Sequence, residues 1–125
     1  MPLSLNFVNA GFKVIGFDID NKKIEQIKKK QSYIWSISSK NICNALSKGF
    51  EATNDFSKIN NVDVIIICVP TPLTKFGQPE LKYLINSINS IKSYLKKEQL
   101  ISIESTTYPG TTEEEIIPIL IKQGF

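Results

Sequence analysis

The sequence predicts an α/β protein built on a doubly wound, Rossmann-like parallel sheet. Three short apolar runs, at residues 13–17, 62–69 and 100–103, are typical of strands, and they alternate with segments of helical periodicity. Such alternation indicates parallel strands joined by helical crossovers. The run at 62–69, VDVIIICV, is nearly continuous and β-branched. It therefore favours a strand that is buried on both faces.

Five segments carry helix signals, and with the strands they give the order α, β, α, α, β, α, β, α. They are residues 2–10, 20–30, 39–48, 79–95 and 111–122. In the fourth segment, apolar residues recur at spacings of three and four, which indicates one apolar helical face. A sheet of this class normally opens with a strand, whereas these residues open with a helix. We therefore expect the sheet to be truncated at its N-terminal side.

Local signals predict where these helices begin and end. Short polar side chains suit the N-cap, proline suits the first position, and glycine suits the position just past the end. A threonine followed three residues later by glutamate forms a capping box. A proline inside the last helix is expected to kink or tighten it. The residues concerned are Gly11, Asp20 or Asn21, Ser39, Gly49, Pro79, the pair Thr111 and Glu114, and Pro118.

Composition excludes several classes of function. The chain has 125 residues with 15 lysines, no arginine, 12 acidic residues and no histidine, for a net charge of +3. The lack of histidine excludes an imidazole base, a Ser-His-Asp triad and a histidine-rich metal site, and we expect no metal. The small charge does not predict nucleic-acid binding. No apolar run is long enough to span a membrane, and no basic signal peptide is present, so we expect a cytoplasmic protein.

The two cysteines, Cys43 and Cys68, belong to no recognisable motif. Cys68 lies inside the apolar run at 62–69, so we expect a buried thiol rather than a nucleophile. Two isolated cysteines do not predict a disulfide framework.

Polar or turn-forming residues follow each predicted strand. The first strand ends at Asp18, the second at residues 69–72 (VPTP) and the third at residues 104–107 (ESTT). In an open α/β sheet, ligands bind outside the carboxyl ends of the strands. The three loops are therefore expected to line one crevice.

Asp18 carries the most information about a ligand. A carboxylate at this strand end accepts hydrogen bonds from the ribose hydroxyls of a dinucleotide and repels a 2′-phosphate, which favours NAD over NADP. The alternative is that Asp18 or Asp20 only caps the following helix. The glycine-rich phosphate loop normally lies about 20 residues before the acid. That position falls before Met1, and these residues contain no such loop.

Three segments also resemble a known family. GFKVIGFDIDNKKI, VIIICVPTPLT and ESTTYPGTTEE, in this order and at this spacing, are similar to the UDP-glucose/GDP-mannose dehydrogenase family over essentially all 125 residues. Within that family the resemblance is strongest to bacterial UDP-N-acetylglucosamine 6-dehydrogenases. The strings VPTPLT and ESTTYPGTTEE are specific, whereas GFDID is common to many nucleotide-binding folds.

The resemblance implies that residues 1–125 are a partial NAD-binding Rossmann domain. Met1, Pro2 and Leu3 match positions just after the last glycine of the family's phosphate loop. We therefore expect the first strand and that loop to be absent, together with the dimerisation and UDP-binding domains. The pyrophosphate of the cofactor is normally held by the N–H groups of the missing loop.

The resemblance also assigns roles at the adenosine end of NAD. Asp18 matches the ribose-binding acid, and Lys23 matches a basic residue beside the adenosine. The alternative for Lys23 is an ordinary surface lysine on a helix.

At the nicotinamide end, Pro70 and Thr71 match the turn that passes under the cofactor. Ser105 and Thr106 match a Ser-Thr pair near the nicotinamide, and Thr106 is expected to assist catalysis by positioning a water or the reacting oxygen. The alternatives are a simple loop break and a plain helix-entry loop. Glu104 ends the strand, and we assign it no proton transfer.

The family reaction oxidises the C6 alcohol of a nucleotide sugar to an acid, with two NAD and a cysteine nucleophile. Neither Cys43 nor Cys68 matches that cysteine, so we expect the isolated chain to be inactive. The resemblance implies the NAD-binding part of a UDP-N-acetylglucosamine dehydrogenase for polysaccharide synthesis, homo-oligomeric at full length, with no nucleic-acid or membrane partner.

Three alternatives stay open. The sugar could be UDP-glucose or UDP-N-acetylmannosamine. The chain could be a non-catalytic remnant that binds NAD weakly or not at all. It could also be a flavodoxin-like signalling module, although only Asp18 and Asp20 approach the acidic cluster that such a module needs.

Overall fold

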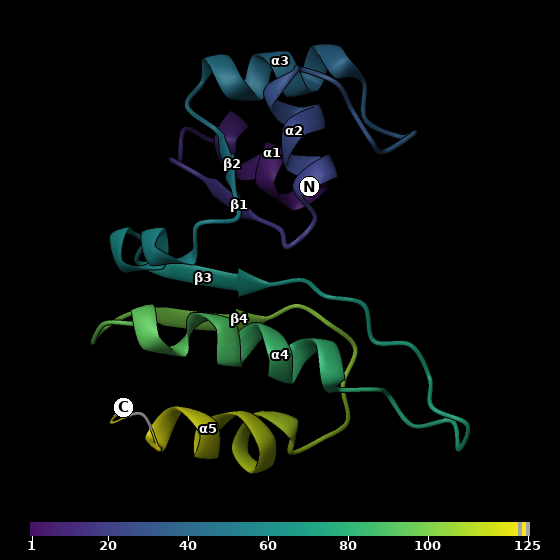
Figure 1. Cartoon of the computed structure of the whole chain (residues 1–125), viewed down its shortest axis with the longest axis vertical. Coiled ribbons are helices and arrows are strands. Elements are labelled where there is room, and N and C mark those ends of the chain that lie inside the picture. Colours follow the sequence, from purple (N-terminus) through teal and green to yellow (C-terminus); the bar gives the residue numbers. More distant parts are fainter. Residues whose placement is uncertain (123, 125) are drawn as a thin grey trace. The chain divides into compact units, whose positions relative to one another are not determined.

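The computed structural model describes residues 1–122 and 124, and they form two compact units, Met1–Asp55 and Phe56–Phe125 (Figure 1). Each unit contains one pair of parallel strands connected through helices. This arrangement confirms the predicted α/β class. No helix in the described part of the chain is both long and apolar enough to cross a membrane.

The first unit contains three helices and two strands. In chain order they are α1 (Pro2–Asn9), β1 (Ile15–Phe17), α2 (Asn21–Lys28), α3 (Ser39–Ser47) and β2 (Glu51–Thr53). Strands β1 and β2 are parallel, with Ile15 opposite Glu51 and Phe17 opposite Thr53. The helices, β2 and the connecting segments bury apolar side chains in one core cluster, which consists of Val8, Ile24, Ile27, Ile37, Ile42, Ala45, Phe50 and Ala52.

The sequence analysis missed β2, which lies in the stretch between the third helix and the run at 62–69. Its three residues, Glu51, Ala52 and Thr53, include a charged residue and only one β-branched residue, so the local signal for a strand is weak. The strand exists because it pairs with β1 and because Ala52 and Thr53 are buried. This is a tertiary effect that overrides local propensity.

The second unit contains one further strand pair and a series of helical segments. They are η1 (Phe56–Asn61), β3 (Val64–Ile67), α4 (Lys82–Ile91), η2 (Lys92–Tyr94), β4 (Leu100–Ile103), η3 (Thr112–Ile116) and α5 (Ile117–Ile121). Strands β3 and β4 are parallel over their full length. The apolar face predicted for the fourth helix is confirmed, because Leu84, Ile88 and Ile91 are buried.

The prediction that the second strand is buried on both faces is wrong for the described structure. Successive side chains of a strand point to opposite faces. Ile65 and Ile67 are buried on one face, whereas Val64 on the other face is 51% exposed. Cys68 is also exposed, so its predicted burial is wrong, and Cys43 is exposed as well.

Two of the predicted helix starts require correction. The N-cap of α3 is Ser38, whose hydroxyl accepts from the Asn41 N–H at 3.2 Å, and not Ser39. Pro79 does not begin α4; it pairs with Leu73 in an isolated bridge, which closes a short hairpin before the helix. The first turn of α4 lies three residues after Pro79.

The predicted capping box before the last helix is also absent. The Thr111 hydroxyl donates to the Tyr108 carbonyl at 2.7 Å instead of accepting from the helix. The turns of η3 are π-helical, and the chain becomes α-helical at Ile117, next to Pro118. Pro118 is therefore associated with a widened segment and not a tightened one, because it has no N–H to donate to the preceding turn.

Gly16 lies where β1 approaches a buried aromatic ring. A Cβ at this position would lie 2.9 Å from Phe50 Cζ, and Phe50 is only 4% exposed. We expect Gly16→Val to lower the free energy of unfolding by about 1–3 kcal/mol, because a packed core resists added volume. Urea denaturation of the 125-residue chain measures this loss. The loss of unfolding free energy caused by Gly16→Val should be smaller when Phe50 is replaced by leucine. An equal loss with phenylalanine and with leucine at position 50 would contradict a clash with the Phe50 ring.

Candidate functional site

The first unit places a carboxylate at the carboxyl end of β1. The Asp18 N–H donates to the Thr53 carbonyl at 3.2 Å, which extends the pairing of β1 with β2 by one residue. Asp18 Oδ1 accepts from the Asp20 N–H at 2.9 Å, and Asp20 in turn accepts from the Lys22 N–H as the N-cap of α2. The helix cap is therefore Asp20, and the Asp18 carboxylate remains 33% exposed at the strand end.

Lys23 is paired with this carboxylate. Its Nζ lies 3.3 Å from Asp18 Oδ2 and 5.8 Å from the centre of the Tyr33 ring. The lysine is thus held between an acid and an aromatic face, a geometry that stabilises its charge. This arrangement makes Lys23 part of the Asp18 cluster, and its side chain is 41% exposed.

Tyr33 is a member of this cluster that the sequence analysis did not single out. Burial raises the pKa of the Tyr33 hydroxyl above its ordinary value, and the negative charge of Asp18 raises it further. The ring lies in the segment between α2 and α3, where the Ser32 hydroxyl donates to the Ile34 carbonyl at 2.9 Å and accepts from the Ile34 N–H at 3.1 Å. No periodicity marks such a loop, so the sequence offered no signal for Tyr33.

The second unit brings together the loops after β3 and β4. The Glu104 N–H donates to the Ile67 carbonyl at 2.9 Å, which is the last backbone hydrogen bond between these two segments in the described residues. The Ser105 hydroxyl then accepts from the Val69 N–H at 2.9 Å and donates to the Val69 carbonyl at 2.9 Å. The predicted residues Pro70 and Thr71 of one loop are therefore attached, through Val69, to the loop that carries Ser105.

Two of the predicted site residues in these loops have hydroxyls that are available for a ligand. Thr71 is half-buried and Thr106 is exposed, and within the part of the chain that the structure describes neither side chain has a hydrogen-bond partner. Glu104, in contrast, accepts from the Ser102 hydroxyl at 2.7 Å. This local bond supports a structural role for Glu104.

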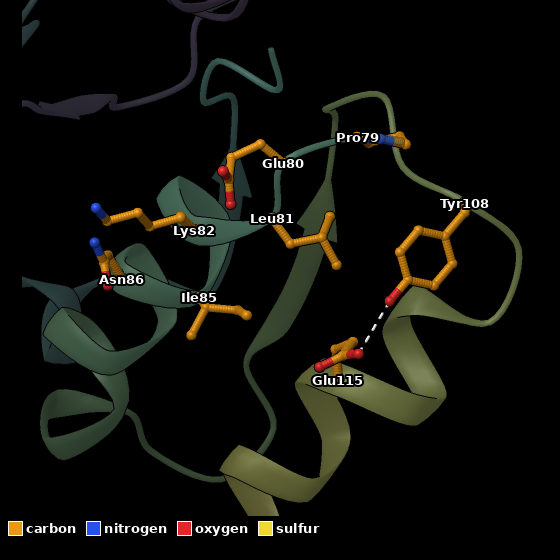
Figure 2. Close-up of a pocket in the computed structure, with 8 residues that line it drawn as sticks. All are labelled: Pro79, Glu80, Leu81, Lys82, Ile85, Asn86, Tyr108 and Glu115. Carbon is orange, nitrogen blue, oxygen red and sulfur yellow. Dashed lines mark hydrogen bonds between the residues drawn. The ribbon is translucent and has the colours of Figure 1, made fainter. Parts of the chain in front are cut away.

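A shallow pocket of about 480 Å³ lies close to the loop that follows β4 (Figure 2). Its lining comes from the start of α4, from the segment after Thr106 and from η3, and consists of Pro79, Glu80, Leu81, Lys82, Ile85, Asn86, Tyr108 and Glu115. Across it, the Tyr108 hydroxyl donates to Glu115 Oε1 at 3.0 Å. This bond raises the pKa of Tyr108, because the carboxylate stabilises the neutral phenol. The sequence analysis missed this pair.

The predicted site residues therefore fall into two groups. Asp18 and Lys23 contact each other in the first unit, whereas Pro70, Thr71, Ser105 and Thr106 lie in adjoining loops of the second unit. Among the described residues, no group of three or more cysteine, aspartate and glutamate side chains could hold a metal ion.

Parallel strands with helical crossovers, an acid after β1 and hydroxyl-bearing loops after β3 and β4 define a Rossmann-like domain of the dinucleotide-binding class. The family model for the UDP-glucose/GDP-mannose dehydrogenase family, NAD binding domain, matches residues 1–124, and the chain belongs to this family. The resemblance noted in the sequence is thus confirmed, and NAD is the cofactor of this domain.

Individual relatives agree with this assignment. The chain is 33% identical to a UDP-N-acetyl-D-glucosamine 6-dehydrogenase from Salmonella typhi over 99% of its own length and 28% of the relative's. It is 35% identical to a UDP-N-acetyl-D-mannosamine dehydrogenase from Methanocaldococcus jannaschii over 91% of its own length and 27% of the relative's. The chain therefore spans less than a third of either relative.

A solved structure is also similar. The UDP-N-acetyl-mannosamine dehydrogenase Cap5O from Staphylococcus aureus superposes with a TM-score of 0.90 at 28% identity, covering 99% of this chain and 30% of that one.

The bond between Tyr108 and Glu115 generates a test by titration. We expect Glu115→Gln to move the pKa of Tyr108 down toward its ordinary value of 10.0, because the charged acceptor that stabilises the neutral phenol is lost. Site-resolved NMR of the tyrosine rings across alkaline pH measures the shift. In the wild type, the raised pKa contributes stability below about pH 10, and this contribution disappears as the pH rises through the pKa of the folded state.

Glu113→Gln is the matched control, since it removes the same charge from the same element without touching the Tyr108 bond. An unchanged Tyr108 titration in Glu115→Gln, or an equal shift in both variants, would argue against the bond.

Proposed function

We propose that the chain is the NAD-binding part of a nucleotide-sugar dehydrogenase that oxidises the C6 alcohol of a UDP-sugar to the uronic acid. The observation that carries this proposal is the family match over residues 1–124, together with the partly exposed acid that follows β1. We propose UDP-N-acetylglucosamine as the sugar nucleotide, for use in polysaccharide synthesis, since a similar relative is named for that substrate. UDP-N-acetylmannosamine is supported by other similar relatives, and UDP-glucose is a further alternative.

By the same resemblance, we propose that the full-length enzyme is a cytoplasmic homo-oligomer. Residues 1–125 would supply the greater part of its NAD-binding domain. The dimerisation and UDP-binding domains would belong to the portions of the relatives that this chain does not match.

The Asp18 cluster suits the adenosine ribose. Each carboxylate oxygen of Asp18 has one bond in the structure, and a carboxylate oxygen can accept at least one more. Two free acceptor positions match the two hydroxyls of a ribose. The negative charge would repel a 2′-phosphate at this position, which accounts for the choice of NAD. Lys23 would hold the carboxylate in place from the helix side.

The loops after β3 and β4 suit the nicotinamide end. When bound there, NAD supplies the acceptor for the hydride that leaves C6 of the sugar. Thr106 would hold a water or the reacting oxygen with its free hydroxyl, and Thr71 would contact the cofactor from the other loop. Pro70 and Ser105 would shape the two loops around it.

The second candidate is a non-catalytic chain with weak or no NAD binding. The observation in its favour is that residues 1–125 contain no glycine-rich phosphate loop, the element that usually binds the pyrophosphate. Neither Cys43 nor Cys68 has a basic partner that would activate it as a nucleophile in the described structure.

Cofactor preference tests the Asp18 assignment. In Asp18→Asn we expect the ratio of the NADP Kd to the NAD Kd to fall at least about tenfold, because like-charge repulsion of the phosphate disappears and Lys23 becomes free to meet it. NMR titration of the chain with each nucleotide measures both constants, even when binding is weak.

Asp20→Asn is the matched control, since it removes the same charge two residues away and asparagine is an equally good N-cap. A ratio that changes equally in the two variants would refute the role of Asp18. Failure of the wild type to bind either nucleotide would favour the second candidate.

Activity of the chain alone is a separate test. We expect the purified 125-residue chain to form no NADH from NAD and UDP-N-acetylglucosamine, because no activated cysteine nucleophile is present in it. The absorbance of NADH is followed with a full-length relative as the positive control. NADH formation by the chain itself would show that its own residues suffice for catalysis.

A further inference from the structure

The Ser105 hydroxyl joins two loops that lie 36 residues apart in the chain. It accepts from the Val69 N–H and donates to the Val69 carbonyl, both at 2.9 Å. A serine hydroxyl has a single proton to donate. Ser105 therefore cannot donate to a cofactor without giving up its bond to Val69.

The bond occurs where the backbone pairing of β3 and β4 ends. The last backbone bond between the two segments runs from the Glu104 N–H to the Ile67 carbonyl. Two residues after Ile67, in the loop that follows β3, the Val69 N–H bonds to the Ser105 side chain. A side chain thus takes the place of the next step of the ladder and carries the pairing two residues beyond each strand end.

Residues with free hydroxyls follow both ends of this bond: Thr71 lies two residues after Val69, and Thr106 lies directly after Ser105. Val69 precedes Pro70, whose ring restricts the backbone of the residue before it and offers no N–H for a bond of its own. With both polar groups of Val69 held by Ser105, the direction of the chain into Pro70 and Thr71 is set. Thr106 follows Ser105 directly. One side chain therefore determines how Thr71 and Thr106 are placed relative to each other.

We propose that Ser105 is a positioning residue, which locks the loop after β3 to the loop after β4 and acts on the cofactor only through Thr71 and Thr106. This inference rests on the proposed function, in which those two threonines face the nicotinamide end of NAD. It distinguishes Ser105 from its neighbour Thr106, although the two adjacent hydroxyls are similar in sequence.

Amide hydrogen exchange of the 125-residue chain, measured by NMR without any ligand, tests whether Ser105 holds the Val69 backbone in place. We expect exchange of the Val69 N–H to become about fivefold faster in Ser105→Ala, the value for loss of one typical hydrogen bond. Ser105→Thr keeps the hydroxyl and should restore slow exchange. Ser102→Ala is the matched control, since it removes from β4 a serine hydroxyl that bonds only to the exposed Glu104.

Equal Val69 exchange in the wild type and in Ser105→Ala would overturn the proposal. If Ser105→Ala does not fold, Val69 exchange in the wild type and in Ser105→Thr still tests the proposal. A Val69 N–H that exchanges as fast as an unstructured amide would overturn the lock, and a protected one that stays protected in Ser105→Thr would support it.

Nucleotide binding then separates positioning from direct contact. We expect Ser105→Ala to weaken NAD binding about fivefold, Ser105→Thr to restore it, and binding of AMP, which lacks the nicotinamide end, to stay unchanged. Weaker NAD binding with unchanged Val69 exchange would make Ser105 a direct ligand and would overturn the proposal. If the wild type binds no NAD although Ser105 protects Val69, the lock stands and the proposed function fails.

Discussion

Parallel strand pairing is the constraint on which the rest of the structure depends. Two parallel strands cannot be joined by a tight turn, so the chain must return through a crossover, and here each crossover is helical. The carboxyl ends of both strands in a pair then lie at the same edge. In the second unit this places the loop that contains Thr71 beside the loop that contains Thr106, although 35 residues separate the two threonines along the chain. The candidate site is a consequence of that geometry.

Polar groups in the two units serve two purposes. Some complete the fold: Asp20 caps α2, and Ser105 extends the pairing of β3 with β4. Others keep capacity for a ligand, as do the partly exposed carboxylate of Asp18 and the hydroxyls of Thr71 and Thr106. Among the hydroxyls, hydrogen-bond occupancy separates these two sets, whereas residue type does not. Adjacent residues such as Ser105 and Thr106 can therefore have different roles within one motif.

The chain belongs to the UDP-glucose/GDP-mannose dehydrogenase family, and NAD is the cofactor of this domain. In the function proposed above, Asp18 and Lys23 of the first unit would serve the adenosine ribose. Thr71 and Thr106 of the second unit would serve the nicotinamide end. This chain corresponds to less than a third of each of the two relatives described above. The groups that would bind and oxidise the sugar are proposed to lie in the parts that it does not match.

The sequence by itself determined the fold class and three strands, predicted at 13–17, 62–69 and 100–103 and observed at 15–17, 64–67 and 100–103, because apolar periodicity is a local property. It also marked Asp18 as a strand-end acid, whereas the proposed roles of Lys23, Thr71 and Thr106 came from the resemblance to the family. Tertiary structure alone decided that residues 51–53 form a strand, that Cys68 is exposed, that Tyr33 packs beside Lys23 and that Ser105 is bonded to Val69. Each of these depends on a neighbour distant in sequence or on which face of a strand is covered. These contacts between distant residues, and the covering of one strand face, form only when the chain packs.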